Sequence, residues 1–163
     1  MSVTNRRFAV ATLLTGVIAG LVGLACIHLL HWIQALAWDM HSGTLLEAVS
    51  AASPARRVLN LVLGGILGAA SWFFLFRRSR AITSVSAAVG GTPMPPLRAT
   101  WHALTQVLIV GLGASVGREV APREMAAAFS AAAADRLGLT PEDRRIIVAC
   151  GAGAGLAAVY SIP

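Results

Sequence analysis

The stretch Gly117-Arg118-Glu119-Val120-Ala121-Pro122-Arg123-Glu124 places four charged side chains inside otherwise apolar sequence, and it decides how the chain folds. Apolar residues fill 103–116 before it and 125–134 after it. Ionisable groups at membrane depth are costly unless they are paired or hydrated, so they mark a functional site by default. The proline at position 122 disfavours an unbroken helix. The stretch therefore predicts a broken helix that carries an acid at membrane depth, as an ion pathway requires.

The composition identifies an integral membrane protein. Of the 163 residues, 56% are hydrophobic and 12% are charged, whereas a soluble domain carries about 25% charged residues. The 13 basic residues are all arginines, but few aromatic side chains lie among them. We therefore expect them to contact anionic lipid and not nucleic acid. No nucleotide-binding or HExxH motif is present, and Cys26 and Cys150 lack CxxC spacing. No cofactor, metal site or enzymatic activity is expected.

Two segments are long enough to cross a membrane as helices. Residues 8–30 follow Arg6 and Arg7, and residues 58–76 end at the arginine-rich stretch 77–80. A cleaved signal peptide is the alternative for the first segment, but its apolar region exceeds the usual ~7–15 residues. Because arginines beside membrane helices favour the cytoplasmic side, we expect a cytoplasmic N-terminus, in a bacterial inner membrane.

The later segments are shorter than a full span of about 20 residues. Residues 103–116 and 125–134 suggest half-helices, and Thr140 followed by Pro141 and two acids begins another helix. The expected fold class is therefore all-α, a polytopic membrane protein with tilted, partly broken helices. Pairs of glycines four residues apart predict close helix packing in lipid: Gly16 and Gly20, Gly64 and Gly68, Gly113 and Gly117, Gly151 and Gly155.

Glu119 is the candidate functional acid. We expect Pro122 to begin a helix whose first N–H groups and positive dipole end attract an anion. Glu119 lies just before this start, where its carboxylate can compete with a permeating anion. The alternative is an ion pair between Glu119 and Arg123, four residues apart, that ties down the turn. Glu124 is expected to be a first-turn acid or an arginine partner.

The remaining polar and aromatic residues receive structural interpretations. The histidines, including His102, show no ligand clustering, and structural or interfacial roles are expected for them. Trp32 and Trp38 follow the first span like an interfacial belt. Tyr160 is expected to pack at an interface and not to line a pathway.

Two stretches resemble the CLC family of chloride channels and chloride/proton antiporters. Gly117-Arg118-Glu119, followed closely by Pro122, resembles the GREGP gating motif of that family. The stretch at 151–163, GAGAGLAAVYSIP, is similar to the family's GAAAGLAAAFNAP at a comparable distance downstream. Residues 16–23 read like its first long helix. The resemblance covers most of the chain.

The resemblance implies both a site and a function. Glu119 would be the gating glutamate, and the backbone amides of Gly117, Arg118 and Val120 would face the anion. Ser79 lies about where the family has the hydroxyl of its central ion site, although the surrounding GSGIP motif is absent. The expected function is transport of an inorganic anion, chloride or a relative, across the membrane.

CLC subunits resemble two inverted halves, and this chain resembles the first half only. We therefore expect 1–163 to form one membrane-embedded domain, the N-terminal half of a longer transporter. Its expected partners are the anion, the lipid bilayer, and the C-terminal half or a second copy in a homodimer. The alternative is a truncated, non-conducting membrane protein that serves as an assembly or regulatory partner. That reading rests on the missing half, the absent GSGIP motif and the added charges of Arg123 and Glu124.

Overall fold

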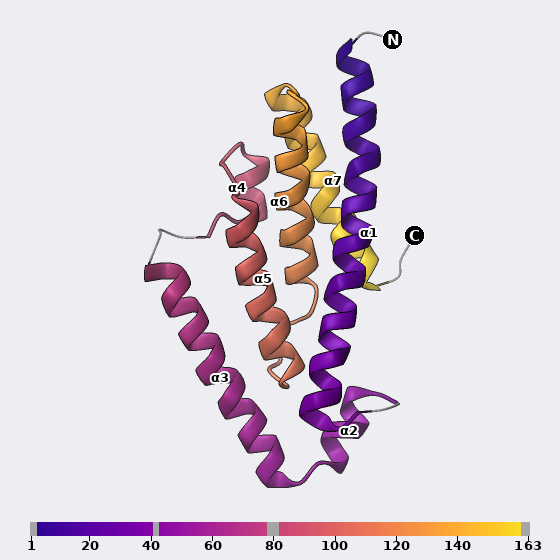
Figure 1. The fold of residues 1–163 in the computed structure, drawn as a ribbon. Helices are drawn as coiled ribbons and strands as arrows, with labels where there is room; N and C mark the ends of the chain where they lie inside the picture. Colours follow the sequence, from indigo (N-terminus) through magenta and orange to yellow (C-terminus); the bar gives the residue numbers. More distant parts are fainter. Residues whose placement is uncertain (1–2, 41–42, 78–81, 161–163) are drawn as a thin grey trace.

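A computed structural model describes residues 3–40, 43–77 and 82–160, and these residues form helices joined by short turns (Figure 1). The predicted all-α class is confirmed, since no strand occurs in the described part of the chain. The helices are α1 (Val3–Trp38), α2 (Leu45–Ala51), α3 (Pro54–Arg77), α4 (Val85–Val89), α5 (Pro96–Gly111), α6 (Val120–Arg136) and α7 (Pro141–Tyr160).

Two of these helices have the length and apolar composition of membrane spans. They are α1, over Asn5–Trp38, and α3, Pro54–Arg77, and they contain the two segments predicted from sequence. Each helix contains an apolar stretch of 18 residues that mostly faces outward. Only 33% of this stretch is buried in α1 and 22% in α3. Exposed leucines on both helices and exposed phenylalanines on α3 fit contact with lipid.

The charged stretch breaks the chain into two short helices, as predicted. Helix α5 has 16 residues and α6 has 17, so each extends only about 25 Å at 1.5 Å per residue. Figure 1 shows them side by side, with the chain reversing direction in the turn between them. Gly113 and Gly117 in this turn have φ of 101° and 85°, a region that favours glycine.

The start of α6 differs from the prediction. The helix begins at Val120, so Pro122 is its third residue and not its first. A proline is tolerated there because the N–H groups of the first turn have no intrahelical acceptor. Pro122 is fully buried. Thr140, in contrast, is the predicted cap of α7, since its hydroxyl accepts from the Asp143 amide at 3.2 Å.

Helix α6 lies at the centre of the bundle, between α5, α7 and α1 (Figure 1). Its buried positions are mostly alanines, which allow neighbouring backbones to approach closely. Three apolar clusters surround it. One joins α1, α5 and α6; one joins α4, α5, α6 and α7; and one joins the N-terminal half of α1 to the adjoining ends of α6 and α7.

Two of the four predicted glycine pairs mediate close helix contacts. A Cβ on Gly155 would lie 2.5 Å from the Pro122 carbonyl oxygen, and Gly151 meets Ser130 in the same way. Gly64 and Gly68 bring α3 against Leu112 and Ile109 of the α5 region. A Cβ added to Gly16 or Gly20 of α1 would meet nothing within 4 Å among the described residues. Gly113 and Gly117 adopt the positive φ of the turn between α5 and α6.

The C-terminal end of α1 is held by polar side chains. Arg56 Nε and Asn60 Nδ2 donate to the Ala37 carbonyl at 2.8 and 2.7 Å, which satisfies an acceptor that the helix end leaves open. Trp38 Nε1 donates to the Gly111 carbonyl at 2.9 Å. Trp38 is buried, so its predicted place in an interfacial belt is wrong, whereas Trp32 is exposed as that prediction requires.

Candidate functional site

The turn before α6 folds the Glu119 side chain back over Gly117. Glu119 is the N-cap residue of α6, but its side chain makes no capping hydrogen bond. A Cβ added to Gly117 would lie 2.6 Å from Glu119 Oε1, so the carboxylate occupies the space that a side chain would fill. The absence of a side chain at Gly117 therefore makes room for an acid beside the positive end of α6.

The alternative ion pair is not formed. Glu119 and Arg123 make no salt bridge within the described ranges, and the Arg123 side chain is exposed. Glu124 is also placed differently from its prediction. Because α6 begins at Val120, Glu124 lies in the second turn, and its partner is His102 of α5 and not an arginine.

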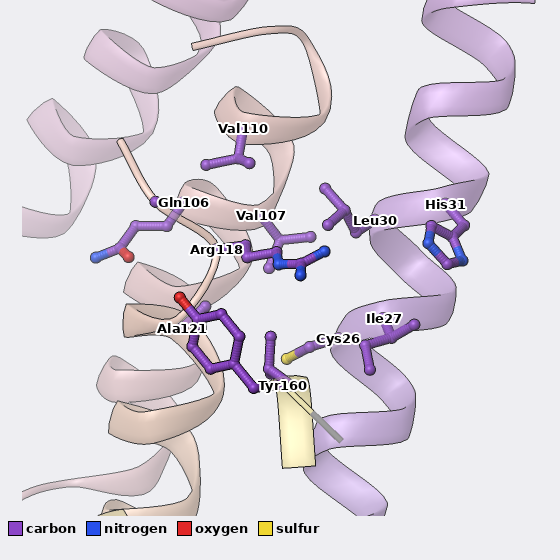
Figure 2. Close-up of a pocket in the computed structure, with 12 residues that line it drawn as sticks. Cys26, Ile27, Leu30, His31, Gln106, Val107, Val110, Arg118, Ala121 and Tyr160 are labelled. Carbon is purple, nitrogen blue, oxygen red and sulfur yellow. The ribbon is translucent and has the colours of Figure 1, made fainter. Parts of the chain in front are cut away.

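A cavity of about 290 Å³ lies beside this turn, enclosed by α1, α5, α6 and α7 (Figure 2). Its wall is mostly apolar, and its few polar groups come from different helices. The lining residues are Cys26, Ile27, Leu30 and His31 of α1; Gln106, Val107 and Val110 of α5; Gly117 and Arg118 of the turn; Ala121 of α6; and Val159 and Tyr160 of α7.

Arg118 and Tyr160 face each other across one side of the cavity. The guanidinium carbon of Arg118 lies 5.7 Å from the centroid of the Tyr160 ring, within the range of a cation–π contact. Figure 2 shows both side chains at the cavity wall. Tyr160 therefore lines the cavity; it is also 46% exposed, and its role in packing at an interface stays a prediction.

A second cavity of about 450 Å³ adjoins the first, toward the loop that contains α2. Five residues line both cavities: Leu30, His31, Val110, Gly117 and Arg118. The second cavity also reaches Gln34 of α1 and Thr44 at the start of α2. The turn at Gly117 and Arg118 thus forms part of the wall shared by the two cavities.

The predicted site residues are brought partly together. Gly117 and Arg118 line both cavities, whereas Glu119 lies next to them with its carboxylate over Gly117. Val120 opens α6 but lines neither cavity. Ser79 lies outside the described residues. The gating role of Glu119 and the anion-facing role of the amides stay predictions.

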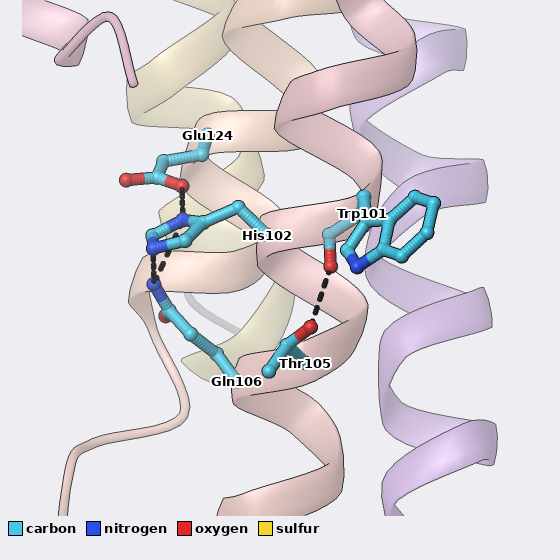
Figure 3. Close-up of polar contacts among 5 residues, drawn as sticks. All are labelled: Trp101, His102, Thr105, Gln106 and Glu124. Atoms are coloured by element: carbon cyan, nitrogen blue, oxygen red, sulfur yellow. Dashed lines mark hydrogen bonds and ion pairs between the residues drawn. The ribbon is translucent and has the colours of Figure 1, made fainter. Parts of the chain in front are cut away.

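The structure also assembles a polar cluster that the sequence analysis missed (Figure 3). His102 Nδ1 lies 2.7 Å from Glu124 Oε2, and Gln106 Nε2 lies 3.1 and 3.3 Å from the two ring nitrogens of His102. The Trp72 ring of α3 lies 6.0 Å from the His102 ring. The four-residue spacing of His102 and Gln106 was the available signal, since it places both on one helix face.

Comparison with known proteins identifies the family of this chain. The family model described as voltage gated chloride channel matches residues 66–163. The chain is 31% identical to the voltage-gated ClC-type chloride channel ClcB of Escherichia coli O81 (strain ED1a), over 97% of the chain and 38% of that protein. It is 30% identical to ClcB of Yersinia pestis, over 93% of the chain and 39% of the relative. No solved structure matches.

The chain thus spans less than two fifths of the length of these curated relatives. That share is consistent with the expected correspondence to the N-terminal half of a CLC protein. The family match includes the Glu119 turn, the cavity-lining part of α5 and the whole of α7. The chain belongs to the voltage-gated chloride channel family.

Proposed function

We propose that residues 1–163 form one membrane-embedded domain, the N-terminal half of a CLC-type anion transporter in which Glu119 gates the pathway. The observation that carries the proposal is the turn shared by the two cavities, with a carboxylate folded over its glycine. An anion in the cavity would meet Arg118 and the turn before the positive end of α6. The Glu119 carboxylate would compete with it for that position.

The orientation of the chain follows from its arginines. Arg6 and Arg7 begin α1, and Arg136 and Arg144 lie at the adjoining ends of α6 and α7. A Cβ on Gly138 would lie 3.5 Å from Arg7 Nη1, so these ends share one side of the bundle. Because arginine excess marks the cytoplasmic side, this arrangement supports the proposal of a cytoplasmic N-terminus in a bacterial inner membrane.

The remaining part of the pathway would come from a second half or a second copy of the chain. Large apolar side chains face outward on both α1 and α3, including Leu13, Leu21 and Phe74. Surfaces of this kind suit lipid or another apolar helix. Chloride is the anion named for the curated relatives, and it is the first substrate to test.

The test is chloride efflux from liposomes that contain the full product of the gene encoding residues 1–163. Glu119→Gln removes the carboxylate charge, so we expect efflux at saturating chloride to persist but to lose most of its pH dependence. Glu142→Gln, an exposed acid at the start of α7, is the matched control and should behave like the wild type. Unchanged pH and chloride dependence in Glu119→Gln would refute the gate. Absence of efflux from every variant would favour the non-conducting partner.

A further inference from the structure

The cluster of His102, Glu124 and Gln106 is a buried titratable group that the proposed gate does not use. The His102 and Glu124 side chains are 16% and 12% exposed, and they connect α5 to α6. Ionisable side chains at such depth mark functional positions by default, because an unpaired charge in an apolar environment is costly.

Gln106 connects this pair to the cavity. Its side chain is 6% exposed and forms part of the cavity wall, while its amide lies against the His102 ring. Figure 2 shows the amide on the side of the cavity away from α1, and Figure 3 shows it directed at the imidazole. Gln106 Oε1 is buried and has no hydrogen-bond partner. An unpaired buried acceptor of this kind requires an explanation.

The protonation state of His102 determines which end of the amide can bond to it. With Glu124 ionised, Nδ1–H of a neutral imidazole donates to the carboxylate, and the Nε2 lone pair accepts from the Gln106 amide N–H. A proton taken from solvent adds to Nε2 and removes that lone pair. The imidazolium then has two N–H donors, and among the described residues bonded to the ring, Gln106 offers the second acceptor, its Oε1. The amide must rotate.

We propose that His102 and Glu124 form a proton-binding site whose occupancy, through rotation of the Gln106 amide, raises the anion affinity of the cavity. The proposal rests on the proposed function, since it requires an anion in that cavity. Rotation gives the unpaired Oε1 a donor and frees the amide N–H₂ group at the cavity wall, where an anion can accept. No covalent bond other than the new N–H bond forms or breaks.

Other ionisable groups near the cluster are on the helices packed against it. Arg98 lies one turn before His102 on α5, and Arg123 adjoins Glu124 on α6. Helix α3 contributes the Trp72 ring, which has no titratable group. On the cavity side, the described ionisable residues are Cys26 and His31 of α1, Arg118 of the turn and Tyr160 of α7. Glu119 is a second acid beside the cavity, so it must be replaced before His102 can be tested.

The experiment therefore uses the full gene product in the Glu119→Gln background, with chloride as the probe. Chloride affinity is measured by calorimetry between about pH 8 and about pH 5, where histidine changes charge. We expect the chloride affinity to rise about tenfold as pH falls, an effect of the size common between two coupled binding sites. By reciprocity, chloride binding should be accompanied by proton uptake, seen in buffers of different ionisation enthalpy.

Gln106→Met keeps the size of the side chain and removes its hydrogen bonds. The rise in chloride affinity with falling pH should therefore drop below about twofold. The matched control is Thr105→Val, which alters an equally buried polar side chain of α5 that lines neither of the two cavities and should keep the full pH-dependent rise in chloride affinity. If Gln106→Met does not fold, His102→Gln tests the same step and should abolish proton uptake.

The possible results separate the two proposals. Chloride binding that does not change with pH in Glu119→Gln, or a full rise retained in Gln106→Met, would overturn the proton site and leave the anion pathway intact. A protein that binds no chloride at any pH would overturn both, because the proton site has no anion to act on.

Discussion

Helices α3 and α6 belong to the same membrane protein but differ both in how apolar they are and in how deeply they are buried. Helix α3 is apolar along its length, and its leucines and phenylalanines face outward. Helix α6 begins with three charged residues in or beside its first two turns, yet most of its other positions are buried. The more apolar helix is thus at the surface and the more polar one at the centre, the reverse of a soluble protein.

The difference shows what holds helices together in lipid. Apolar side chains gain little by moving from lipid into a protein, so packing and hydrogen bonds determine the contacts. Helix α6 provides them with alanines that admit α7 and with Glu124, which bonds His102. Helix α3 adds contacts at Gly64, Gly68 and Ser71, and its Arg56 and Asn60 side chains bond the end of α1. Stability should therefore depend on the inner helices, and the following substitutions test this.

The largest effect is expected from Gly155→Val. Its Cβ would lie 2.5 Å from the Pro122 carbonyl oxygen and 2.8 Å from the Ala126 Cβ, so α7 must move away from α6. We expect a loss of about 3 kcal/mol or more in unfolding free energy, because backbone atoms cannot yield as a flexible side chain does. The measurement is denaturant unfolding of the full gene product in detergent.

The control for this change is Gly65→Val on α3. An added Cβ there meets nothing within 4 Å, and it faces the outside of the bundle. The substitution should change the unfolding free energy by less than about 0.5 kcal/mol. Equal effects at the two glycines would contradict the distinction between inner and outer helices.

A second effect is expected at the junction of α1 and α5. Trp38→Phe keeps most of the buried ring but leaves the Gly111 carbonyl without its 2.9 Å donor. A buried acceptor without a partner costs about 1–3 kcal/mol, which should appear as a lower unfolding midpoint. Trp32→Phe is the control, since Trp32 is exposed and should tolerate the change. A neutral result at Trp38 would show that another donor replaces the indole.

A smaller effect is expected from removing the hydrogen bonds between Ser71 of α3 and helix α5. Ser71 Oγ lies 2.6 Å from Thr105 Oγ1 and accepts from Trp101 Nε1 at 2.8 Å. Ser71→Ala removes both bonds, and interhelical hydrogen bonds in membrane proteins average about 0.6 kcal/mol. A double-mutant cycle with Thr105→Val measures the coupling directly. A coupling of zero would mean that this hydrogen bond adds nothing to the contacts of α3 at its glycines and at Arg56 and Asn60.

The smallest effect is expected from Leu59→Ala on the outer face of α3. Leu59 is 56% exposed, so its side chain exchanges lipid contacts for lipid contacts, and the change should stay within about 0.5 kcal/mol. Ile147→Ala on α7 is the comparison, because Ile147 is 1% exposed and its truncation should cost about 2–5 kcal/mol. If Leu59→Ala were as damaging, this face of α3 would be covered by protein and not by lipid.

Much of the fold was accessible from local sequence. The apolar segments 8–30 and 58–76 identify α1 and α3, and the charged stretch with Pro122 locates the break between α5 and α6. These features depend on a residue and its near neighbours along the chain. The position of the break was right to within a turn, and the error at its start arose because a proline is tolerated anywhere in a first helical turn.

The sequence by itself determined that this is a helical membrane protein with an acid at a helix break, because composition and local backbone preference are properties of the chain alone. Only the tertiary structure decided which groups meet. The His102–Glu124 pair joins residues 22 positions apart, and the cavity beside Gly117 draws its wall from four helices and a turn. Such contacts depend on which helix faces pack together, and in a chain with little amphipathic pattern the sequence does not specify those faces.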